Sequence, residues 1–195
     1  MKILIAVPTF ETITPECFKA IYDLDKGEHQ VDFDFIKGYD CAEARNRIAE
    51  LALAGCYDYV LMVDSDTIIP RDTLTTMLED PVRICLGVCP KKNTKEGQTA
   101  LCKMESRYFN DCWYYPELPE ERFEVKVGGF ACALIDVTVF RDTPKPWFRY
   151  AVFDDGSIMS EDFYFCNNAS AWYGIPVYAD PRVKCGHLAR YFQYE

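Results

Sequence analysis

The sequence predicts an α/β protein built on a mostly parallel, doubly wound β-sheet with a smaller antiparallel part. Two observations predict this fold class. Over roughly residues 1–90, segments with strand patterns alternate with segments with helix patterns, and this order is typical of parallel sheets. Within them, residues 59–63 (Tyr-Val-Leu-Met-Val) form an unbroken apolar run, which predicts a strand buried on both faces. The 195 residues, 49% of them hydrophobic, are enough for one domain with a packed core.

The first half of the chain is expected to alternate strands and helices. Thr14 is a suitable N-cap residue, and Pro15 suits the first turn of the helix that it opens. Phe33 and Phe35 alternate with aspartates, which is the period-two pattern of a half-buried strand, and Gly55 is suited to end a helix. In chain order we predict a strand at 2–7, a helix at 14–24, a strand at 31–35, a helix at 41–54, the buried strand, a short helix from residue 70 and a strand at 83–88.

The second half has a more mixed pattern. Residues 91–127 combine lysine, glycine and threonine with short alternating runs, which predicts antiparallel strands and loops. Ser160 is placed to cap a helix with acids in its first turn, where the helix dipole favours them, and Gly174 is placed to end it. We predict a glycine-led strand at 128–135, a short helix at 136–140, a loop at 144–153, a helix at 160–173, and strands at 176–179 and 183–188.

Composition and charge argue against several classes of partner. A formal net charge of −10 makes a broad surface for nucleic acid or anionic membranes unfavourable. The apolar run at the N-terminus is too short for a signal peptide, and no run reaches the ~18 apolar residues that a transmembrane helix needs. We therefore expect a cytoplasmic protein with no nucleic-acid partner and no transmembrane segment.

The ten cysteines are interpreted as mostly buried thiols rather than as a disulfide scaffold. The spacing of Cys85 and Cys89 is not that of a standard zinc site. Cysteine inside an apolar run behaves as a small hydrophobic residue, and four cysteines lie in such runs: Cys56, Cys85, Cys132 and Cys166.

Two carboxylates, Asp64 and Asp66, follow the buried strand directly. Ligands of open parallel sheets bind at the carboxyl ends of the strands, so this pair is expected at the ligand-binding edge. Two carboxylates so close together, backed by the sheet, are unfavourable unless a cation joins them. The pair therefore predicts a divalent metal. An acidic turn without a ligand is the alternative, because aspartate is common in turns.

Further motifs follow in a specific order. They are the Asp64-Ser65-Asp66 pair, the glycine loop Gly128-Gly129-Phe130, Glu161-Asp162 at a helix start, a C-terminal His187, and Ala44-Arg45-Asn46 in the helix before the buried strand. In this order, from Ile3 to His187, the chain resembles GT-A fold glycosyltransferases, close in pattern to glycosyltransferase family 2 and its relatives. The resemblance implies a single GT-A domain over residues 1–195. It divides this domain into a nucleotide-binding half at 1–90 and a donor-sugar and acceptor half at 91–195.

The resemblance implies a metal-dependent glycosyltransferase, a hexosyltransferase, that moves a sugar from a UDP-sugar or GDP-sugar to a hydroxyl of a glycan or other acceptor with inversion. It assigns ligation of Mn²⁺ or Mg²⁺ to Asp66 and His187, with Asp64 near the ribose or the water shell of the metal. Such ions take few ligands from protein and the rest from phosphates and water, and an imidazole ligand favours Mn²⁺. A surface or core histidine is the alternative for His187.

The same resemblance makes Asp162 the catalytic base, with Glu161 orienting the acceptor or the loop. Alternatively, the two acids only stabilise a helix N-terminus. The absence of Cβ atoms at Gly128 and Gly129 lets the backbone approach a donor sugar, although a tight turn into a core strand would also need glycine.

Other candidates lie near the same edge of the sheet. Thr9 and Glu11 follow the first strand, where this family holds the nucleobase. Arg45 could reach a phosphate or the base, whereas Arg47 is interpreted as a solvated helix charge. Three aromatic residues are candidates for stacking on a sugar ring, or equally for core packing under a loop: Trp147, Phe148 and Tyr150.

Three alternatives stay open. Asp64-x-Asp66-x-Ile68 also resembles the nucleophile motif of haloacid-dehalogenase-like phosphatases, although here two βα units precede it and no downstream lysine has a convincing place. A non-catalytic module that binds a sugar nucleotide or glycan would keep the same fold. A Cys185–His187 nucleophile is a weaker idea, because nothing supplies an oxyanion site. Because little sequence follows His187, a second copy or another chain could complete the acceptor site.

Overall fold

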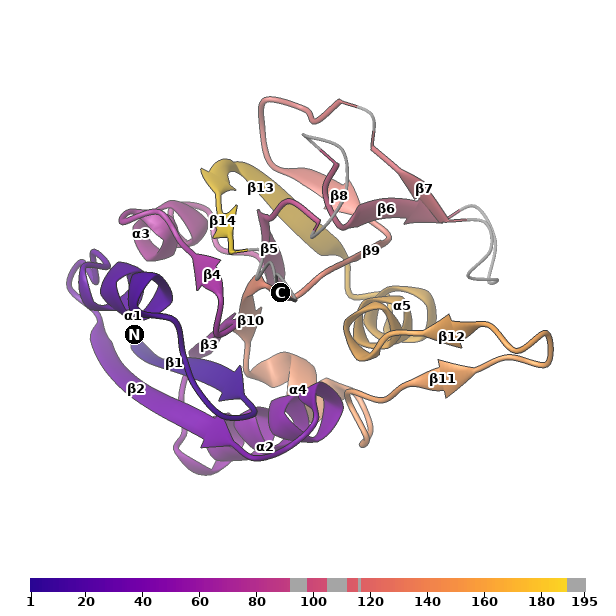
Figure 1. Cartoon of the computed structure of the whole chain (residues 1–195), viewed down its shortest axis with the longest axis horizontal. Helices are drawn as coiled ribbons and strands as arrows, with labels where there is room; N and C mark the ends of the chain where they lie inside the picture. The colour runs from indigo at the N-terminus through magenta and orange to yellow at the C-terminus, as the bar shows by residue number, and fades with distance from the viewer. Residues whose placement is uncertain (92–97, 105–111, 116, 189–195) are drawn as a thin grey trace, which may run out of the picture.

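The computed structural model describes residues 1–91, 98–104, 112–115 and 117–188. Within them, a seven-stranded sheet has the order β2-β1-β3-β10-β5-β13-β8 (Figure 1). Five of these strands run in one direction, whereas β10 and β8 are antiparallel to their neighbours. The predicted fold class is therefore confirmed. The strands are β1 (Lys2–Thr9), β2 (Gln30–Lys37), β3 (Tyr59–Val63), β5 (Ile84–Val88), β8 (Phe123–Val125), β10 (Cys132–Asp136) and β13 (Val177–Lys184).

Helices cover both faces of this sheet. They are α1 (Pro15–Tyr22), α2 (Cys41–Ala54), α3 (Thr73–Leu78), α4 (Thr138–Asp142) and α5 (Glu161–Tyr173). Along β1, Ile3 and Ile5 pack in a core cluster with residues of α1 and α3, whereas Leu4 and Ala6 pack in a second cluster with residues of α2, α4 and α5. This alternation follows from the two-residue period of a strand, and it makes the protein doubly wound.

Small antiparallel sheets lie beside the central one. The first pairs β4 (Thr67–Ile68) with β14 (Gly186–His187). The second contains β6 (Leu101–Met104), β7 (Cys112–Tyr114) and β9 (Val127–Gly128). The third is the hairpin of β11 (Ala151–Val152) and β12 (Ile158–Met159). They confirm the antiparallel part predicted for the second half, as far as the described residues extend. No helix in the described ranges is long and apolar enough to cross a membrane.

The local signals for helix ends were mostly correct. The Thr14 side chain accepts a hydrogen bond from the Cys17 backbone N–H, and Pro15 opens α1. Gly174 ends α5 with a left-handed φ of 62°. Ser160 stands at the N-cap position of α5, but its side chain does not cap the helix, because its hydroxyl donates to Asp162 Oδ1 instead.

Two strand predictions differ from the structure. The strand expected at 128–135 is two strands, β9 and β10, joined by a short loop at Gly129. The strands expected at 176–179 and 183–188 are one continuous strand, β13, followed by β14. Strand β13 shifts register between Asp180 and Lys184, so a local irregularity interrupts the pattern without ending the strand.

Burial also differs at particular residues. Phe33 and Phe35 are 39% and 38% exposed because β2 is an edge strand, and they pack edge-on against each other with ring centroids 4.6 Å apart. Cys56, predicted to be buried, is exposed in a turn at positive φ, whereas Cys85, Cys132 and Cys166 are buried as predicted. A short apolar run therefore did not distinguish a core position from a turn.

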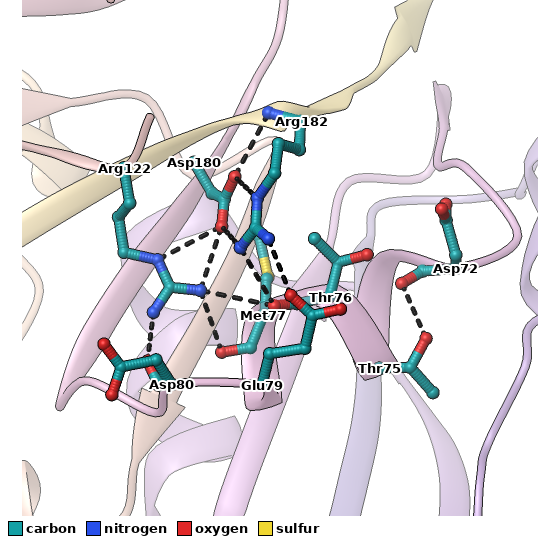
Figure 2. Close-up of polar contacts among 9 residues, drawn as sticks. All are labelled: Asp72, Thr75, Thr76, Met77, Glu79, Asp80, Arg122, Asp180 and Arg182. Carbon is teal, nitrogen blue, oxygen red and sulfur yellow. Dashed lines mark hydrogen bonds and ion pairs between the residues drawn. The ribbon is translucent and has the colours of Figure 1, made fainter. Parts of the chain in front are cut away.

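Strand β13 is fastened to α3 by a buried carboxylate between two arginines (Figure 2). Asp180 is fully buried and accepts hydrogen bonds from Arg122 Nη2 at 2.9 Å and from Arg182 Nη2 at 2.7 Å. Arg122 Nη2 also donates to the carbonyl oxygens of Thr76 and Met77 at the end of α3, at 3.3 and 3.2 Å. Burial alone would raise the pKa of Asp180, but the hydrogen bonds from the two arginines outweigh it and lower that pKa.

Candidate active site

The carboxyl ends of the parallel strands meet at one edge of the sheet, where most of the predicted site residues lie. Asp64 directly follows β3, and its backbone N–H donates to Ala131 O at 3.0 Å, which holds the loop before β10 beside it. The antiparallel pairing of β14 with β4 places His187 opposite Thr67, immediately after the acidic pair. These contacts join segments that lie far apart in the sequence.

Asp66 and His187, the two side chains predicted to ligate a metal, lie next to each other. His187 Nε2 lies 3.4 Å from Asp66 Oδ1, and His187 Nδ1 lies 2.8 Å from the carbonyl oxygen of Pro90. Because a carbonyl oxygen only accepts, the second contact requires the proton on Nδ1, so in the neutral ring Nε2 carries the lone pair. Two donor atoms at this separation can share one divalent ion at roughly 2.1 Å from each.

Asp64, the third predicted ligand, is arranged differently. Its Oδ1 forms a 2.8 Å salt bridge with Arg45 Nη2. Among the residues that the structure describes, no group of three or more histidine, cysteine or acidic side chains is arranged to hold a metal ion. The protein pair of Asp66 and His187 therefore fits an ion that takes most of its ligands from phosphate and water.

Arg45 lies beneath the site and is only 2% exposed. It bridges Asp64 and Glu161, whose Oε1 accepts from Arg45 Nη1. Burial raises the pKa values of both carboxyl groups, and Arg45 opposes that shift. Arg45 does not line either cavity beside the acidic pair, so its side chain positions these acids instead of opening toward a phosphate or base.

Two cavities open on either side of Asp64. One, of about 400 Å³, is lined by residues that include Thr9, Tyr39, Asp66 and Tyr150. A contiguous hollow includes Glu11 with Thr9 and Asp66. The other, of about 250 Å³, has residues of both halves of the chain in its lining: Asp64, Lys91, Gly129, Phe130, Asp162 and His187.

Asp162 lines the smaller cavity, and its two oxygens have different surroundings. Its Oδ1 accepts the hydroxyl of Ser160 and, at 2.7 Å, the backbone N–H of Phe163. Its Oδ2 would lie 3.6 Å from a Cβ atom added at Gly129. Glu161 next to it is buried against Arg45, so the two acids at the start of α5 have different environments.

A side chain would have different consequences at Gly128 and at Gly129. A Cβ atom at Gly128 would come within 2.5 Å of Leu86 Cδ1 and 2.9 Å of Leu101 Cδ2, so core packing excludes a side chain there. Gly129 lines the smaller cavity, where an added Cβ atom would reduce the space near Asp162. Only Gly129 thus has the position expected for backbone approach to a ligand.

The three aromatic candidates for stacking on a sugar also have different environments. Trp147 and Phe148 are core residues: Trp147 Nε1 donates to two backbone carbonyls, and Phe148 stacks on Phe165 at 4.6 Å. Tyr150 is exposed and lines the larger cavity. Arg47 pairs with Glu43 at the surface, as a solvated helix charge does.

Sequence reasoning named Asn46 only as part of the Ala44-Arg45-Asn46 motif, and it missed Tyr39 and Lys91. Asn46 anchors the loop after α4, because its side chain bonds the backbone of Trp147 and Phe148. Tyr39 and Lys91 line the larger and the smaller cavity, respectively. Lys91 could have been identified from its position after β5, at the edge of the sheet where ligands bind. For Tyr39, the sequence offered only its position before α2.

Comparisons with known proteins establish the fold. No protein-family model and no curated protein matches the chain. Among solved structures, A197 from STIV superposes with a TM-score of 0.68 at 15% identity, covering 97% of this chain and 87% of that one. S. aureus TarS 1–349 in complex with UDP gives 0.57 at 15% identity, covering 95% and 60%. GalNAc-T7 with UDP, GalNAc and Mn²⁺ gives 0.56 at 12% identity, covering 96% and 44%.

These identities are too low to carry more than architecture. The chain spans 60% of the TarS chain and 44% of the GalNAc-T7 chain. The likeness confirms the predicted GT-A type of fold.

Proposed function

We propose that this protein is a metal-dependent glycosyltransferase that transfers a sugar from a UDP-sugar or GDP-sugar to an acceptor hydroxyl. The observation that carries the proposal is the Asp66–His187 pair, with 3.4 Å between Oδ1 and Nε2, at the binding edge of a GT-A type sheet. The bound UDP of TarS, and the UDP and Mn²⁺ of GalNAc-T7, support this class of ligand for the fold.

Asp66 and His187 would hold the ion, with Asp64 beside it. Mn²⁺ or Mg²⁺ bound there would supply positive charge that stabilises the leaving diphosphate. The larger cavity and the hollow at Glu11 would take the nucleoside, with Thr9 between them. The smaller cavity would take the sugar, with Gly129 allowing close approach of the backbone.

The linings of the two cavities support different roles for the two halves of the chain. Apart from Tyr150, the lining residues of the larger cavity all belong to residues 1–90, which we propose to be the nucleotide-binding half. Residues 91–195 contribute Gly129, Asp162 and His187 to the smaller cavity, and would form the donor-sugar and acceptor half.

Asp162 is the proposed base. Hydrogen bonds engage its Oδ1, and its Oδ2 lies on the side of Gly129, which lines the same cavity; there Oδ2 would accept the proton of the acceptor hydroxyl during an inverting attack. Glu161, which pairs with Arg45, would position the start of α5. A phosphatase that uses Asp64 as nucleophile has less support, because Oδ1 of Asp64 is engaged by Arg45.

Thermal unfolding with UDP, GDP and CDP, each with Mn²⁺, with Mg²⁺ and with chelator, tests the donor site. A ligand at a concentration a hundredfold above its dissociation constant adds about 2.7 kcal/mol to the free energy of unfolding. In a domain of this size, this raises the melting temperature by roughly 5–10 °C. We expect a shift with one nucleotide that chelator removes. No shift with any nucleotide would contradict the proposal.

Two variants separate binding from catalysis. Asp66→Ala should lose the metal-dependent shift, whereas Asp162→Asn should keep it and lose at least a hundredfold in transfer rate. Asp34→Ala, at an exposed aspartate on β2, is the matched control and should behave as wild type. A non-catalytic binding module would show the nucleotide shift and no transfer in the wild-type protein.

A further inference from the structure

Four cysteines lie together on one face of the central sheet, next to the candidate site. Cys85 is in β5 and Cys89 follows it, Cys132 begins β10, and Cys185 follows β13. All four are buried, reduced, and part of the core that faces α1 and α3. The proposed function uses none of their thiols.

Gly87 allows these thiols to approach one another. A Cβ atom added at Gly87 would lie 3.2 Å from the sulfur of Cys132 and also 3.2 Å from the sulfur of Cys185. The proximity of the Cys185 sulfur raises the pKa values of both the Cys89 and the Cys132 thiols. Three sulfur atoms therefore converge over a strand position that has no side chain.

One pair in this group, Cys89 and Cys185, lies in register on the neighbouring segments that follow β5 and β13. Lys184 pairs with Val88 in parallel, and Cys185 N donates to Val88 O at 2.9 Å, so Cys185 and Cys89 are neighbours on adjacent strands. Cys132 is on the far side of β5, so it lies about two strand spacings, roughly 9–10 Å, from Cys185. It is a diagonal neighbour of Cys89 at roughly 7–8 Å. Both separations exceed the usual ~7 Å limit between Cα atoms.

Cys89, although only 6% exposed, belongs to the lining of a cavity. It lines the smaller cavity together with Pro90 and His187. A low-molecular-weight disulfide that enters this cavity would meet the Cys89 sulfur first, with the Cys185 thiol beside it.

We propose that Cys89 and Cys185 are a site of reversible oxidation, at which a low-molecular-weight disulfide such as glutathione disulfide converts the two thiols into a protein disulfide. The Cys89 thiol loses its proton as its sulfur attacks one sulfur of the oxidant and breaks its S–S bond, and the departing sulfur takes up a proton and leaves as one thiol. The Cys185 sulfur then attacks the Cys89 sulfur of this mixed disulfide and releases the second thiol. The protein loses two protons and two electrons, and the two released thiols carry them.

This disulfide would form directly beneath the proposed metal ligand. Cys89 precedes Pro90, whose carbonyl oxygen contacts His187 Nδ1 at 2.8 Å, and Cys185 lies two residues before His187. Drawing the sulfurs to about 2.05 Å moves both segments together. We therefore expect oxidation to weaken binding of nucleotide with Mn²⁺ at least tenfold. This consequence rests on the proposed function, whereas the formation of the disulfide does not.

Mass spectrometry of the full chain tests the chemistry first. The reduced protein is treated with glutathione disulfide, and its intact mass and a peptide map under non-reducing conditions are recorded. We expect the loss of two hydrogen masses, a Cys89–Cys185 cross-link, and reversal by dithiothreitol. A bridge between another pair, a lasting glutathione adduct on Cys89, or an unchanged protein would overturn the proposal. Stoichiometric zinc in the reduced protein that is lost in Cys89→Ser would also overturn it, because the thiols would then be a metal site.

Variants and a binding measurement complete the test. Cys89→Ser and Cys185→Ser should lose the cross-link, whereas Cys132→Ser, in the same cluster, and Cys56→Ser, at the surface, should keep it. The dissociation constant for UDP or GDP with Mn²⁺ should rise at least tenfold in oxidised wild type and stay constant in treated Cys185→Ser. Unchanged binding in the cross-linked protein would overturn the proposed regulation. Absence of nucleotide binding in the reduced protein would instead contradict the proposed function, and the mass measurement would still decide the disulfide.

Discussion

Two charge clusters in this protein surround buried carboxylates but balance their charges differently. At the candidate site, one arginine, Arg45, bridges two acids, Asp64 and Glu161. At the junction of β13 and α3, two arginines, Arg122 and Arg182, hold one acid, Asp180 (Figure 2). The first cluster therefore has an excess of negative charge, whereas the charges of the second balance because Arg182 also pairs with Glu79 at 2.6 Å.

The difference appears in the pKa values and in where the remaining hydrogen bonds go. The pKa values of Asp64 and Glu161 are raised by burial despite Arg45, whereas the pKa of Asp180 is lowered by its two arginines. At the second cluster, backbone carbonyls at the end of α3 accept the spare guanidinium hydrogens. The second cluster is electrostatically satisfied by protein alone, and the first has negative charge that an added cation would neutralise. We infer that the cluster at Asp180 is a structural clamp and that the cluster at Arg45 is part of a ligand-binding site.

Removal of the single arginine should have the largest effect. Arg45→Met leaves Asp64 and Glu161 without their buried cation, and breaking such a pair costs about 3–5 kcal/mol. Urea unfolding at pH 7 measures the free energy of unfolding. Arg47→Met, which breaks a surface pair on the same helix, is the control and should change it by about 0–1 kcal/mol. Equal effects of the two substitutions would contradict the role given to Arg45.

Removal of the charge from the clamp should be somewhat less severe. Asp180→Asn weakens the charged hydrogen bonds to Arg122 and Arg182, and the side chain of Arg182 is already 45% exposed to water. We expect a loss of about 2–3 kcal/mol in the free energy of unfolding. Nucleotide binding by the folded variant should equal that of wild type. A tenfold loss of nucleotide affinity would show that the clamp belongs to the site.

The pH dependence of the same variant sharpens the comparison. Because the folded-state pKa of Asp180 is lowered, its stabilisation is fully present above the unfolded value of about 4 and is lost as the pH falls through the folded value. The difference in unfolding free energy between wild type and Asp180→Asn should therefore be constant from pH 7 to about 5 and decrease below about 4. A difference that does not change with pH would mean that packing, not charge, holds this junction.

The smallest effect is expected for an acid of the site. The folded-state pKa of Glu161 is raised, so its stabilising contribution is full below the unfolded pKa and is lost as the pH rises through the folded value. Glu161→Gln keeps an oxygen that can accept from Arg45 and should change the free energy of unfolding at pH 7 by less than about 1 kcal/mol, toward higher stability. Thermal unfolding at pH 4 and pH 7 measures it, and the two proteins should converge at pH 4. A large loss of stability in Glu161→Gln at pH 7 would mean that the charge of Glu161 stabilises the fold, as the charge of Asp180 does.

Much of the fold and part of the candidate site followed from local signals. The apolar run at 59–63 predicted a strand buried on both faces, and its residues 60–63 are fully buried. Helix α2 has the predicted bounds, because its helix-forming residues end at Gly55. The place of Asp64 and Asp66 at the ligand-binding edge followed from their position after that strand. Each of these inferences uses only neighbouring residues.

The sequence by itself thus determined most of the elements, the class of the sheet and the edge at which a site is expected. Tertiary structure alone decided that β10 runs antiparallel between β3 and β5, that Arg45 pairs with Glu161, and that Cys185 lies beside Cys89. The physical reason is sequence separation: hydrophobic periodicity reports which face of an element is buried. The pairing of residues that are far apart in the chain depends on strand order and register, which no local pattern encodes.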